Sequence, residues 1–317
     1  MTSHAASASP WQTSHLELPD GRRLEVATTG DESLPAVVLH HGTPQSFLPM
    51  TWLVQTAREI GVRLVTVARP GYRTSTRHPG RSVADVAPDT AVVLDHLGID
   101  RCVTAGTSGG GPHALACAAL LPGRVTAAAS VCGVAPYDLA GTVGLDFLTG
   151  MGEDNVAEFE AARNGEGPVR AVVEGMLPTL SGGDPDGFLD AWDTLLPEVD
   201  RASLTGHIGQ ELLASVAAAL DRPHGPADGW VDDDLAFVRP WGLDLREITV
   251  PVSLWQGGLD QMVPYAHGGA LRELLPAGTA VHLLPQEGHL SIVVGSFGAV
   301  LRELVEMGQV GSSSPHP

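Results

Sequence analysis

The sequence is poor in basic residues and has no long apolar run. Only 18 of its 317 residues are lysine or arginine, against 37 aspartate or glutamate, so the formal net charge is -19 at pH 7. This negative field repels phosphate backbones and anionic lipid head groups, which argues against nucleic-acid and membrane partners. No stretch has the roughly 18 uninterrupted apolar residues of a membrane-spanning helix, and residues 1–15 lack the pattern of a secretion signal. We therefore expect a cytoplasmic protein.

Cysteine is also scarce. Cys102, Cys117 and Cys132 are widely spaced, and each lies among small apolar residues. An odd number of cysteines without metal-ligand spacing predicts neither a disulfide framework nor a zinc site. We expect buried, reduced thiols that act as small hydrophobic side chains, and no metal site.

What the sequence does have is apolar residues, which make up 43% of the chain and are enough for a large buried core. Residues 1–14 and 308–317 are rich in small and polar residues without an apolar pattern, which predicts disordered tails. The length between them suits one core domain with an inserted subdomain. We expect a small-molecule substrate, and the chain is compatible with a homodimer.

Short apolar runs alternate with helical patterns along residues 36–131. This alternation predicts right-handed crossovers and a mostly parallel sheet with helices on both faces, which is an α/β fold. A β-hairpin precedes it, because Pro19-Asp20-Gly21 separates two short alternating runs. The expected strands are 15–18, 22–28, 36–39, 63–68, 102–105, 125–131, 250–256 and 280–284, and the expected core helices are 47–60, 83–97, 110–121, 267–275 and 292–307.

The alternation stops after Val131 and resumes at Val250. Between these points lie several short helical patterns broken by glycine and proline. We therefore assign residues 133–249 to an inserted helical cap, and residues 15–132 and 250–307 to the core. The expected cap helices are 154–162, 169–176, 187–195 and 209–220.

The run GTSGG (106–110) matches the G-x-S-x-G turn that exposes a nucleophilic serine. Because glycine is common in this chain, about 0.27 such matches arise by chance, and the motif alone is weak evidence. The context of the motif strengthens this evidence, because a strand pattern precedes GTSGG and a helical pattern follows it. Such a turn pushes Ser108 toward positive φ, and Gly106 and Gly110 leave room where strand and helix approach each other.

A serine hydroxyl needs a base to remove its proton, and the base needs a carboxylate to orient it. In this class of strand-turn-helix site, the acid and then the histidine follow the serine, each after a late strand. Asp260 follows the strand pattern 250–256 and His289 follows 280–284, so both lie beyond the carboxyl ends of parallel strands. We assign Asp260 as the orienting acid and His289 as the base, with Asp138 as the alternative acid.

The negative charge that develops on an attacked carbonyl oxygen needs donors. The helix after Ser108 points its backbone N–H groups and positive dipole end at that charge. A second donor is expected from the loop HHGTP (40–44), where Pro44 has no N–H to offer. We predict an oxyanion hole formed by the backbone N–H groups of Thr43 and Gly109.

Five motifs in this order make the chain resemble the α/β-hydrolase superfamily, in its cap-bearing, esterase-like branch. The resemblance covers about residues 15–307. It implies an eight-stranded, mostly parallel sheet, no cofactor, and a Ser-Asp-His triad beneath a helical cap. The motifs are HHGTP (40–44), RPGY (69–72), GTSGG (106–110), WQGGLDQMVP (255–264) and EGHL (287–290).

Some positions depart from the family's patterns. Where relatives often have Asp-x-Pro-Gly-x-Gly-x-Ser, Ala68 and Arg73 replace the acid and the second glycine, which indicates a loop of different shape or ligand. The GTSGG turn lacks the Trp of prolyl aminopeptidases and the Met of many cofactor-free haloperoxidases and C–C hydrolases. The nucleophile position holds Ser108 rather than Asp, so the resemblance also speaks against haloalkane dehalogenase and epoxide hydrolase activity.

The cap carries enough large aromatic side chains to line a pocket and exclude water, although most would pack the cap's own helices. The run Trp230-Val231-Asp232-Asp233-Asp234 could bind a substrate amine. Three adjacent carboxylates are more typical of a solvated loop or a helix N-terminus, and we expect that here. The aromatic residues are Phe147, Phe159, Phe188, Trp192, Trp230, Phe237 and Trp241.

The residues favour a serine hydrolase that cleaves a small-molecule ester, thioester, lactone or related carbonyl compound through an acyl-Ser108 intermediate. The same triad could instead pass the acyl group to another nucleophile, as an acyltransferase or cyclase of a biosynthetic pathway. A third hypothesis is a ligand receptor on the same fold that does not depend on turnover.

Overall fold

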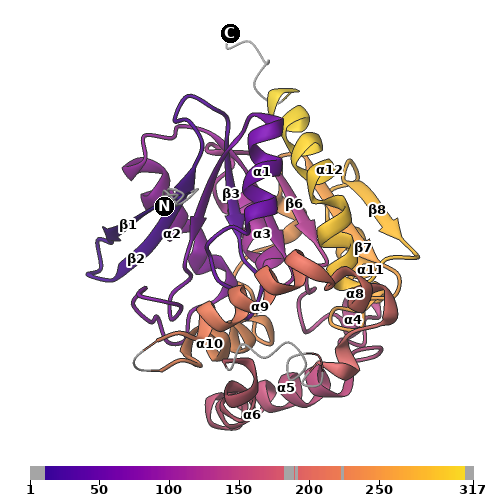
Figure 1. Ribbon diagram of the computed structural model, residues 1–317. Coiled ribbons are helices and arrows are strands. Elements are labelled where there is room, and N and C mark those ends of the chain that lie inside the picture. The colour runs from indigo at the N-terminus through magenta and orange to yellow at the C-terminus, as the bar shows by residue number, and fades with distance from the viewer. Residues whose placement is uncertain (1–10, 182–188, 190–191, 223–224, 311–317) are drawn as a thin grey trace, which may run out of the picture.

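A computed structural model of the chain describes residues 11–181, 189, 192–222 and 225–310 (Figure 1). Its centre is an eight-stranded sheet with the strand order β1-β2-β4-β3-β5-β6-β7-β8. The pairs β1–β2 and β2–β4 are antiparallel, and every other pair is parallel. The expected mostly parallel sheet is confirmed. The strands are β1 (Gln12–Glu17), β2 (Arg23–Thr29), β3 (Ala36–His40), β4 (Arg63–Val67), β5 (Cys102–Thr107), β6 (Val125–Val131), β7 (Val252–Gly257) and β8 (Ala280–Leu284).

Helices cover both faces of this sheet. Along β3, Val37 and Leu39 pack into the cluster under α1 and α12, whereas Ala36 and Val38 pack into the cluster under α2, α3 and α11. This alternation is the period of two that a strand buried on both faces requires. Figure 1 shows α1 and α12 side by side on one face. The core helices are α1 (Thr51–Ile60), η1 (Val83–Asp85), α2 (Val86–His96), α3 (Gly110–Leu120), α11 (Tyr265–Leu274) and α12 (His289–Val310).

A set of helices interrupts the core between β6 and β7, as the sequence predicts for residues 133–249. Figure 1 shows α5, α6, α9 and α10 beyond the ends of the parallel strands. They share an apolar cluster that includes Trp230 and Val173 and reaches Met262 of the core. The expected helix 187–195 lies partly outside the described residues. The helices are α4 (Ala140–Val143), α5 (Glu153–Arg163), α6 (Glu166–Leu180), η2 (Asp193–Leu195), α8 (Glu198–Ser203), α9 (Gly206–Leu220), α10 (Asp228–Phe237) and η3 (Leu245–Glu247).

Several boundaries differ from the sequence predictions, both near the ends of the chain and in the core helices. The first strand begins at Gln12, inside the segment 1–14 that was expected to be disordered, because its backbone pairs with β2 although its side chains are mostly exposed. The last helix continues to Val310, since Gly308 packs closely against Val103 and Thr126. The first core helix begins only at Thr51 instead of residue 47.

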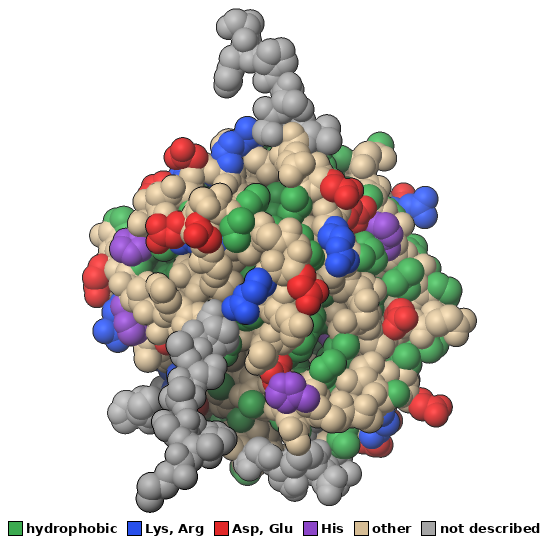
Figure 2. All heavy atoms as spheres, turned by 45° about the horizontal axis from the view of Figure 1, so that its top comes forward, with side chains coloured by type: hydrophobic (Ala, Val, Ile, Leu, Met, Phe, Trp, Pro, Cys, Tyr) green, Lys and Arg blue, Asp and Glu red, His purple; other side chains and the backbone are tan. Residues whose placement is uncertain are grey.

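Charged side chains of both signs are interspersed on the face shown in Figure 2, and hydrophobic side chains form small separate areas there. In the described part of the chain, no helix combines the length and apolar character that crossing a membrane requires. Buried charged side chains lie inside the molecule instead, at the boundary between the cap helices and the ends of the strands.

Candidate active site

Ser108 lies on a sharp turn between β5 and α3. Its φ is 52°, in the left-handed region that side chains with a Cβ rarely adopt. A Cβ on Gly106 would come within 2.0 Å of Gly110 O, and a Cβ on Gly110 within 2.1 Å of His40 O. Both glycines are therefore required by the close packing of β5, α3 and the loop after β3. The strained turn presents Ser108 above the carboxyl ends of the strands.

Asp260 and His289 lie together after β7 and β8. His289 Nδ1 is 2.8 Å from Asp260 Oδ2. The carboxylate is held in turn, because Asp260 Oδ1 accepts hydrogen bonds from the backbone N–H groups of Met262 and Val263 at 2.9 and 2.8 Å. The alternative acid, Asp138, is exposed, and in the described part of the chain it makes no ion pair with His289.

The environment of His289 favours its protonated form. Burial alone would lower the pKa of this imidazole, but the adjacent Asp260 carboxylate, together with Cys132, more than offsets burial and raises the pKa well above the usual 6.5. His289 is therefore a stronger base than an isolated histidine.

Two cavities meet at Ser108. One, of about 660 Å³, is lined by Ser108 and His289 together with mostly apolar side chains. The other, of about 600 Å³, is lined by Ser108 and by cap residues that include Glu158 and Asp234. Within the described residues, no hydrogen bond joins Ser108 Oγ to His289, although both residues line the same cavity. Such bonds often form only when substrate is bound.

The loop that precedes Pro44 is packed directly against the turn that carries Ser108. A Cβ on Gly109 would come within 2.3 Å of Thr43 Oγ1, which places these two residues side by side. In the described part of the chain, neither the N–H of Thr43 nor that of Gly109 donates a hydrogen bond. The two backbone groups predicted to hold the oxyanion are therefore adjacent and available.

Arg69 fixes the shape of this loop. Its guanidinium donates hydrogen bonds to the carbonyl oxygens of His41 and Gly42 and to Thr43 Oγ1. It also forms a buried ion pair of 2.6 Å with Asp233 of α10, and Thr43 Oγ1 donates to the same carboxylate at 2.6 Å. Arg69 has no sequence signal of its own beyond its place in RPGY (69–72), although Ala68 and Arg73 indicate a loop of unusual shape.

The expectation of a solvated acidic run at residues 232–234 is wrong. These residues lie within α10, and their three carboxylates are buried. Asp232 pairs with Arg77, and Asp233 pairs with Arg69 and Arg81. The carboxylates are buried because arginines from the loop after β4 reach under the cap, and this tertiary pairing has no local sequence signal.

Asp200 of α8 contacts the predicted base from the cap side. It is fully buried, and its carboxylate accepts hydrogen bonds from the backbone N–H groups of His289, Leu290 and Ser291 at 2.8 to 2.9 Å. These are the first N–H groups of α12, which have no partner inside the helix. A cap residue therefore anchors the helix that begins with His289. Asp200 was not predicted, because it lies about 90 residues away in the sequence.

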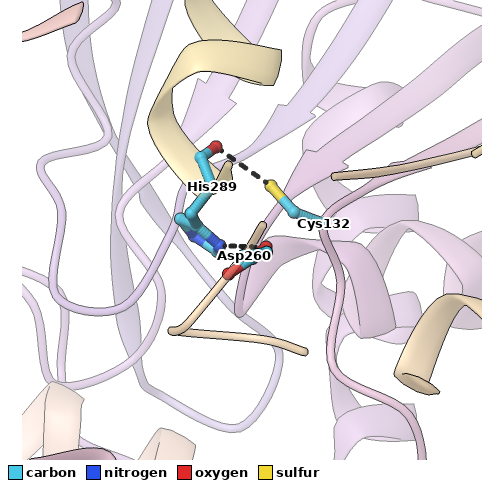
Figure 3. Close-up of side chains that lie close together, drawn as sticks. All are labelled: Cys132, Asp260 and His289. Atoms are coloured by element: carbon cyan, nitrogen blue, oxygen red, sulfur yellow. Dashed lines mark hydrogen bonds and ion pairs between the residues drawn. The ribbon is translucent and has the colours of Figure 1, made fainter. Parts of the chain in front are cut away.

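Cys132 lies beside the pair formed by Asp260 and His289 (Figure 3). Potential ligand atoms of the three side chains lie within 4.8 Å of one another. The arrangement fits a hydrogen-bonded pair better than a metal site, because the histidine nitrogen faces the carboxylate directly and the thiol donates to the His289 carbonyl oxygen at 3.6 Å. Burial also raises the pKa of Cys132, which disfavours the thiolate that a metal requires.

Comparison with known proteins relates the chain to hydrolases. A family model described as alpha/beta hydrolase fold matches residues 35–166. The chain is 31% identical over 271 residues to an uncharacterised hydrolase of Bacillus subtilis (strain 168), YcgS, which covers 86% of this chain and 89% of YcgS. It is 24% identical over 306 residues to epoxide hydrolase A of Mycobacterium tuberculosis, with 87% of this chain and 93% of that protein covered.

Solved structures share the fold at low sequence identity. A putative aryl esterase from Burkholderia cenocepacia superimposes with a TM-score of 0.66 at 19% identity, covering 94% of this chain and all of the other. A hydrolase from Pseudomonas aeruginosa PA01 gives 0.65 at 20% identity, covering 94% and 99% of the two chains.

Proposed function

This chain belongs to the α/β-hydrolase family and is a hydrolase, and from that premise we propose that it cleaves an ester, thioester, lactone or related carbonyl compound through an acyl-Ser108 intermediate. The observation that carries the proposal is the Asp260–His289 pair at 2.8 Å, placed at a cavity that Ser108 also lines. A nucleophile, a base and an orienting acid are the groups that acyl transfer requires.

In the proposed mechanism, His289 Nε2 takes the proton of Ser108 Oγ as that oxygen attacks the carbonyl carbon. The carbonyl oxygen becomes an oxyanion, which accepts hydrogen bonds from the N–H groups of Thr43 and Gly109. Collapse of this intermediate breaks the bond to the leaving group, and His289 gives its proton to the departing oxygen or sulfur. Water then attacks the acyl-enzyme by the same steps and releases the acid.

Arg69 and Asp200 support this chemistry without touching the reacting atoms. Arg69 holds the carbonyl oxygens of His41 and Gly42, so the N–H of Thr43, which lies opposite the Gly42 carbonyl in the same peptide unit, points away from the guanidinium. Asp200 fixes the first turn of α12 and with it the backbone of His289. Donors that are fixed before the reaction lower the barrier, because they need not reorganise as charge develops.

Epoxide hydrolases are among the relatives, and the identity of the nucleophile decides against that chemistry in our proposal. If Ser108 Oγ opened an epoxide ring, the product would be an ether. An ether has no carbonyl carbon that water can attack, so the enzyme would be blocked after one turnover. An acyl substrate gives an ester on Ser108, which water can hydrolyse.

The proposal is tested with p-nitrophenyl acetate and butanoate. The wild type is expected to release p-nitrophenol, and Ser108→Ala is expected to lower kcat at least about a thousandfold. Ser14→Ala, which removes an exposed serine hydroxyl from β1, serves as the matched control and should keep full activity. Turnover by Ser108→Ala at the wild-type rate, or no ester hydrolysis by the wild type, would contradict the proposal.

The pH dependence provides a second readout. Because the base must be unprotonated, kcat/KM should rise with pH, and its midpoint should lie above 6.5, since Asp260 raises the pKa of His289. Product mass separates hydrolysis from acyl transfer: hydrolysis adds water to the acyl group, whereas transfer or cyclisation does not. A dominant transfer product would favour an acyltransferase or cyclase.

A further inference from the structure

Two carboxyl groups line one of the cavities at Ser108. They belong to Glu158 of α5 and Asp234 of α10, and each affects the ionisation of the other. Both line the cavity that also contains Ser108 and Gly109, and both are more than nine-tenths buried. The acidic pair is therefore part of the wall that a substrate of Ser108 would contact.

Among the described residues, no cationic side chain forms an ion pair with the acidic pair of Glu158 and Asp234. Glu158 Oε1 accepts a hydrogen bond from Trp230 Nε1 at 2.7 Å, but in the described part of the chain no arginine or histidine pairs with either carboxyl group. Asp234 Oδ2 is buried and receives no hydrogen bond there, apart from a proton it can share with Glu158. Such an arrangement is costly, because a buried carboxylate without a cation loses its hydration without compensation.

The two carboxyl groups of the acidic pair also share a proton, which a bound cation could displace. Burial and the charge of Glu158 raise the pKa of Asp234 well above its usual range, and burial raises the pKa of Glu158. Two carboxyl groups in contact cannot both ionise easily, so they titrate as a unit that shares one proton. The acidic pair then carries one negative charge and gains a second when a cation displaces the proton.

The rest of this cavity suits a cation with a carbon skeleton. Its walls include the aromatic rings of Phe159, Trp230 and Phe237. Aromatic faces attract cations through their quadrupole and exclude water, which strengthens attraction to the acidic pair. Anionic substrates would be repelled from this side of Ser108.

The second cavity has a different character and adjoins the base. Its lining includes Met50, Trp52, Ile208 and Val293, with His289 as its one ionisable side chain among the described residues. Since His289 must reach the leaving group to protonate it, the leaving group belongs in this apolar cavity. The acyl group then extends into the cavity that holds the acidic pair.

We propose that the natural substrate has an acyl group bearing a positively charged amine, which Glu158 and Asp234 bind, and an apolar leaving group, which occupies the cavity beside His289. This inference rests on the proposed acyl-Ser108 chemistry. Binding of the ammonium group ionises the acidic pair fully, and the shared proton passes to solvent. The amine is recognised by charge and hydrogen bonding, and no covalent bond to it forms or breaks.

The test compares p-nitrophenyl esters that differ only by an ammonium group in place of a terminal methyl group. The pairs are glycyl and propanoyl, β-alanyl and butanoyl, and 6-aminohexanoyl and heptanoyl esters, which sample different depths of the cavity. The quantity measured is the ratio of kcat/KM for the ammonium ester to that for its methyl partner. The ratio for the wild type is then divided by the ratio for a variant. This second division cancels the difference in intrinsic reactivity between the two esters of a pair.

For at least one pair, Asp234→Asn and Glu158→Gln are each expected to lower this ratio about tenfold or more, because the ammonium loses a charged partner. The methyl esters should react as well as before or better. Glu160→Gln is the matched control, since it removes an exposed carboxylate two residues further along α5 and should leave the ratio unchanged. Circular dichroism and the melting temperature establish that each variant is folded.

The inference would be overturned if, for all three pairs of esters, the ratio of kcat/KM for the ammonium ester to that for the methyl ester were no larger in the wild type than in the two variants. It would also be overturned if a 6-hydroxyhexanoyl ester were preferred to the ammonium ester, because the acidic pair would then be a neutral hydrogen-bonding site. If either variant failed to fold, the ratio in the wild type and in the other variant would still decide the question. Failure of the proposed function looks different, since neither ammonium nor methyl esters would then be hydrolysed through Ser108.

Discussion

Asp233 and Asp234 are neighbours on α10, yet they face different surroundings. Asp233 is surrounded by donors: Arg69, Arg81 and the hydroxyl of Tyr72 all contact its carboxylate. Asp234 lines the cavity at Ser108, and the ionisable group that interacts with it most strongly is Glu158, another acid. One helix thus carries a neutralised carboxylate and an uncompensated one in consecutive positions.

The protonation of the two aspartates follows from these partners. Burial would raise the pKa of Asp233, but the two arginines outweigh burial and hold it well below its usual range. For Asp234, burial and the neighbouring acid act in the same direction and raise the pKa. Asp233 therefore links α10 to the loop 40–44 through Arg69 and Thr43, whereas Asp234 has the environment of a carboxyl group whose ionisation opposes folding.

The largest expected effect comes from removing the neutralised charge. Asp233→Asn leaves Arg69 and Arg81 buried without their counter-charge, which should lower the free energy of unfolding by about 3–5 kcal/mol. Urea denaturation at pH 7 measures this change. Asp95→Asn is the matched control, because it breaks an ion pair of similar length with Arg124 in which the carboxylate is exposed, and its cost should be about 0–1 kcal/mol. Equal costs for the two variants would mean that the buried pair does not hold the cap.

An intermediate effect is expected at Asp200, whose partners are backbone N–H groups rather than arginines. Asp200→Ala removes the anchor of α12 and should cost about 1–2 kcal/mol of stability, in the range of a lost helix cap. It should also lower kcat/KM for p-nitrophenyl esters, because His289 begins that helix. Asp200→Asn keeps one acceptor oxygen and should recover part of both losses. Unchanged activity in Asp200→Ala would show that His289 is positioned without the cap.

The smallest effect, with the opposite sign, is expected at the uncompensated acid. A raised pKa in the folded state means that ionisation of Asp234 opposes folding, so Asp234→Asn should stabilise the protein by about 1 kcal/mol at pH 7. The difference should shrink as the pH falls toward 4, where the unfolded chain also binds the proton. Thermal unfolding between pH 4 and 8 measures it. A loss of stability at pH 7 would show that the carboxylate is compensated after all.

The fold and the three predicted catalytic residues followed from local signals. Strand patterns next to glycine turns located Ser108, Asp260 and His289, because such residues follow strand ends in a fixed order along the chain. The contacts of Arg69, Asp200 and Asp234 could not be found in this way. Each depends on how the cap helices lie over the core, and sequence separations of 76 to 164 residues leave no periodic pattern.

The acidic run shows the limit most clearly. Local reasoning favours solvent for three adjacent carboxylates, because it contains no sign that three arginines after β4 and one acid on α5 will meet α10. Of the residues 230–234, which could bind a substrate amine, only Asp234 is part of the amine site that we propose, together with Glu158. The other two aspartates have arginine partners.

The most direct test of the account is the covalent labelling of the nucleophile. The protein is treated with a fluorophosphonate, digested, and analysed by mass spectrometry with peptide mapping. The account predicts one added phosphonyl group on Ser108, lost in Ser108→Ala and formed more slowly in His289→Ala. Labelling that persists in Ser108→Ala, or that maps to another residue, would contradict the assignment of Ser108 as the nucleophile.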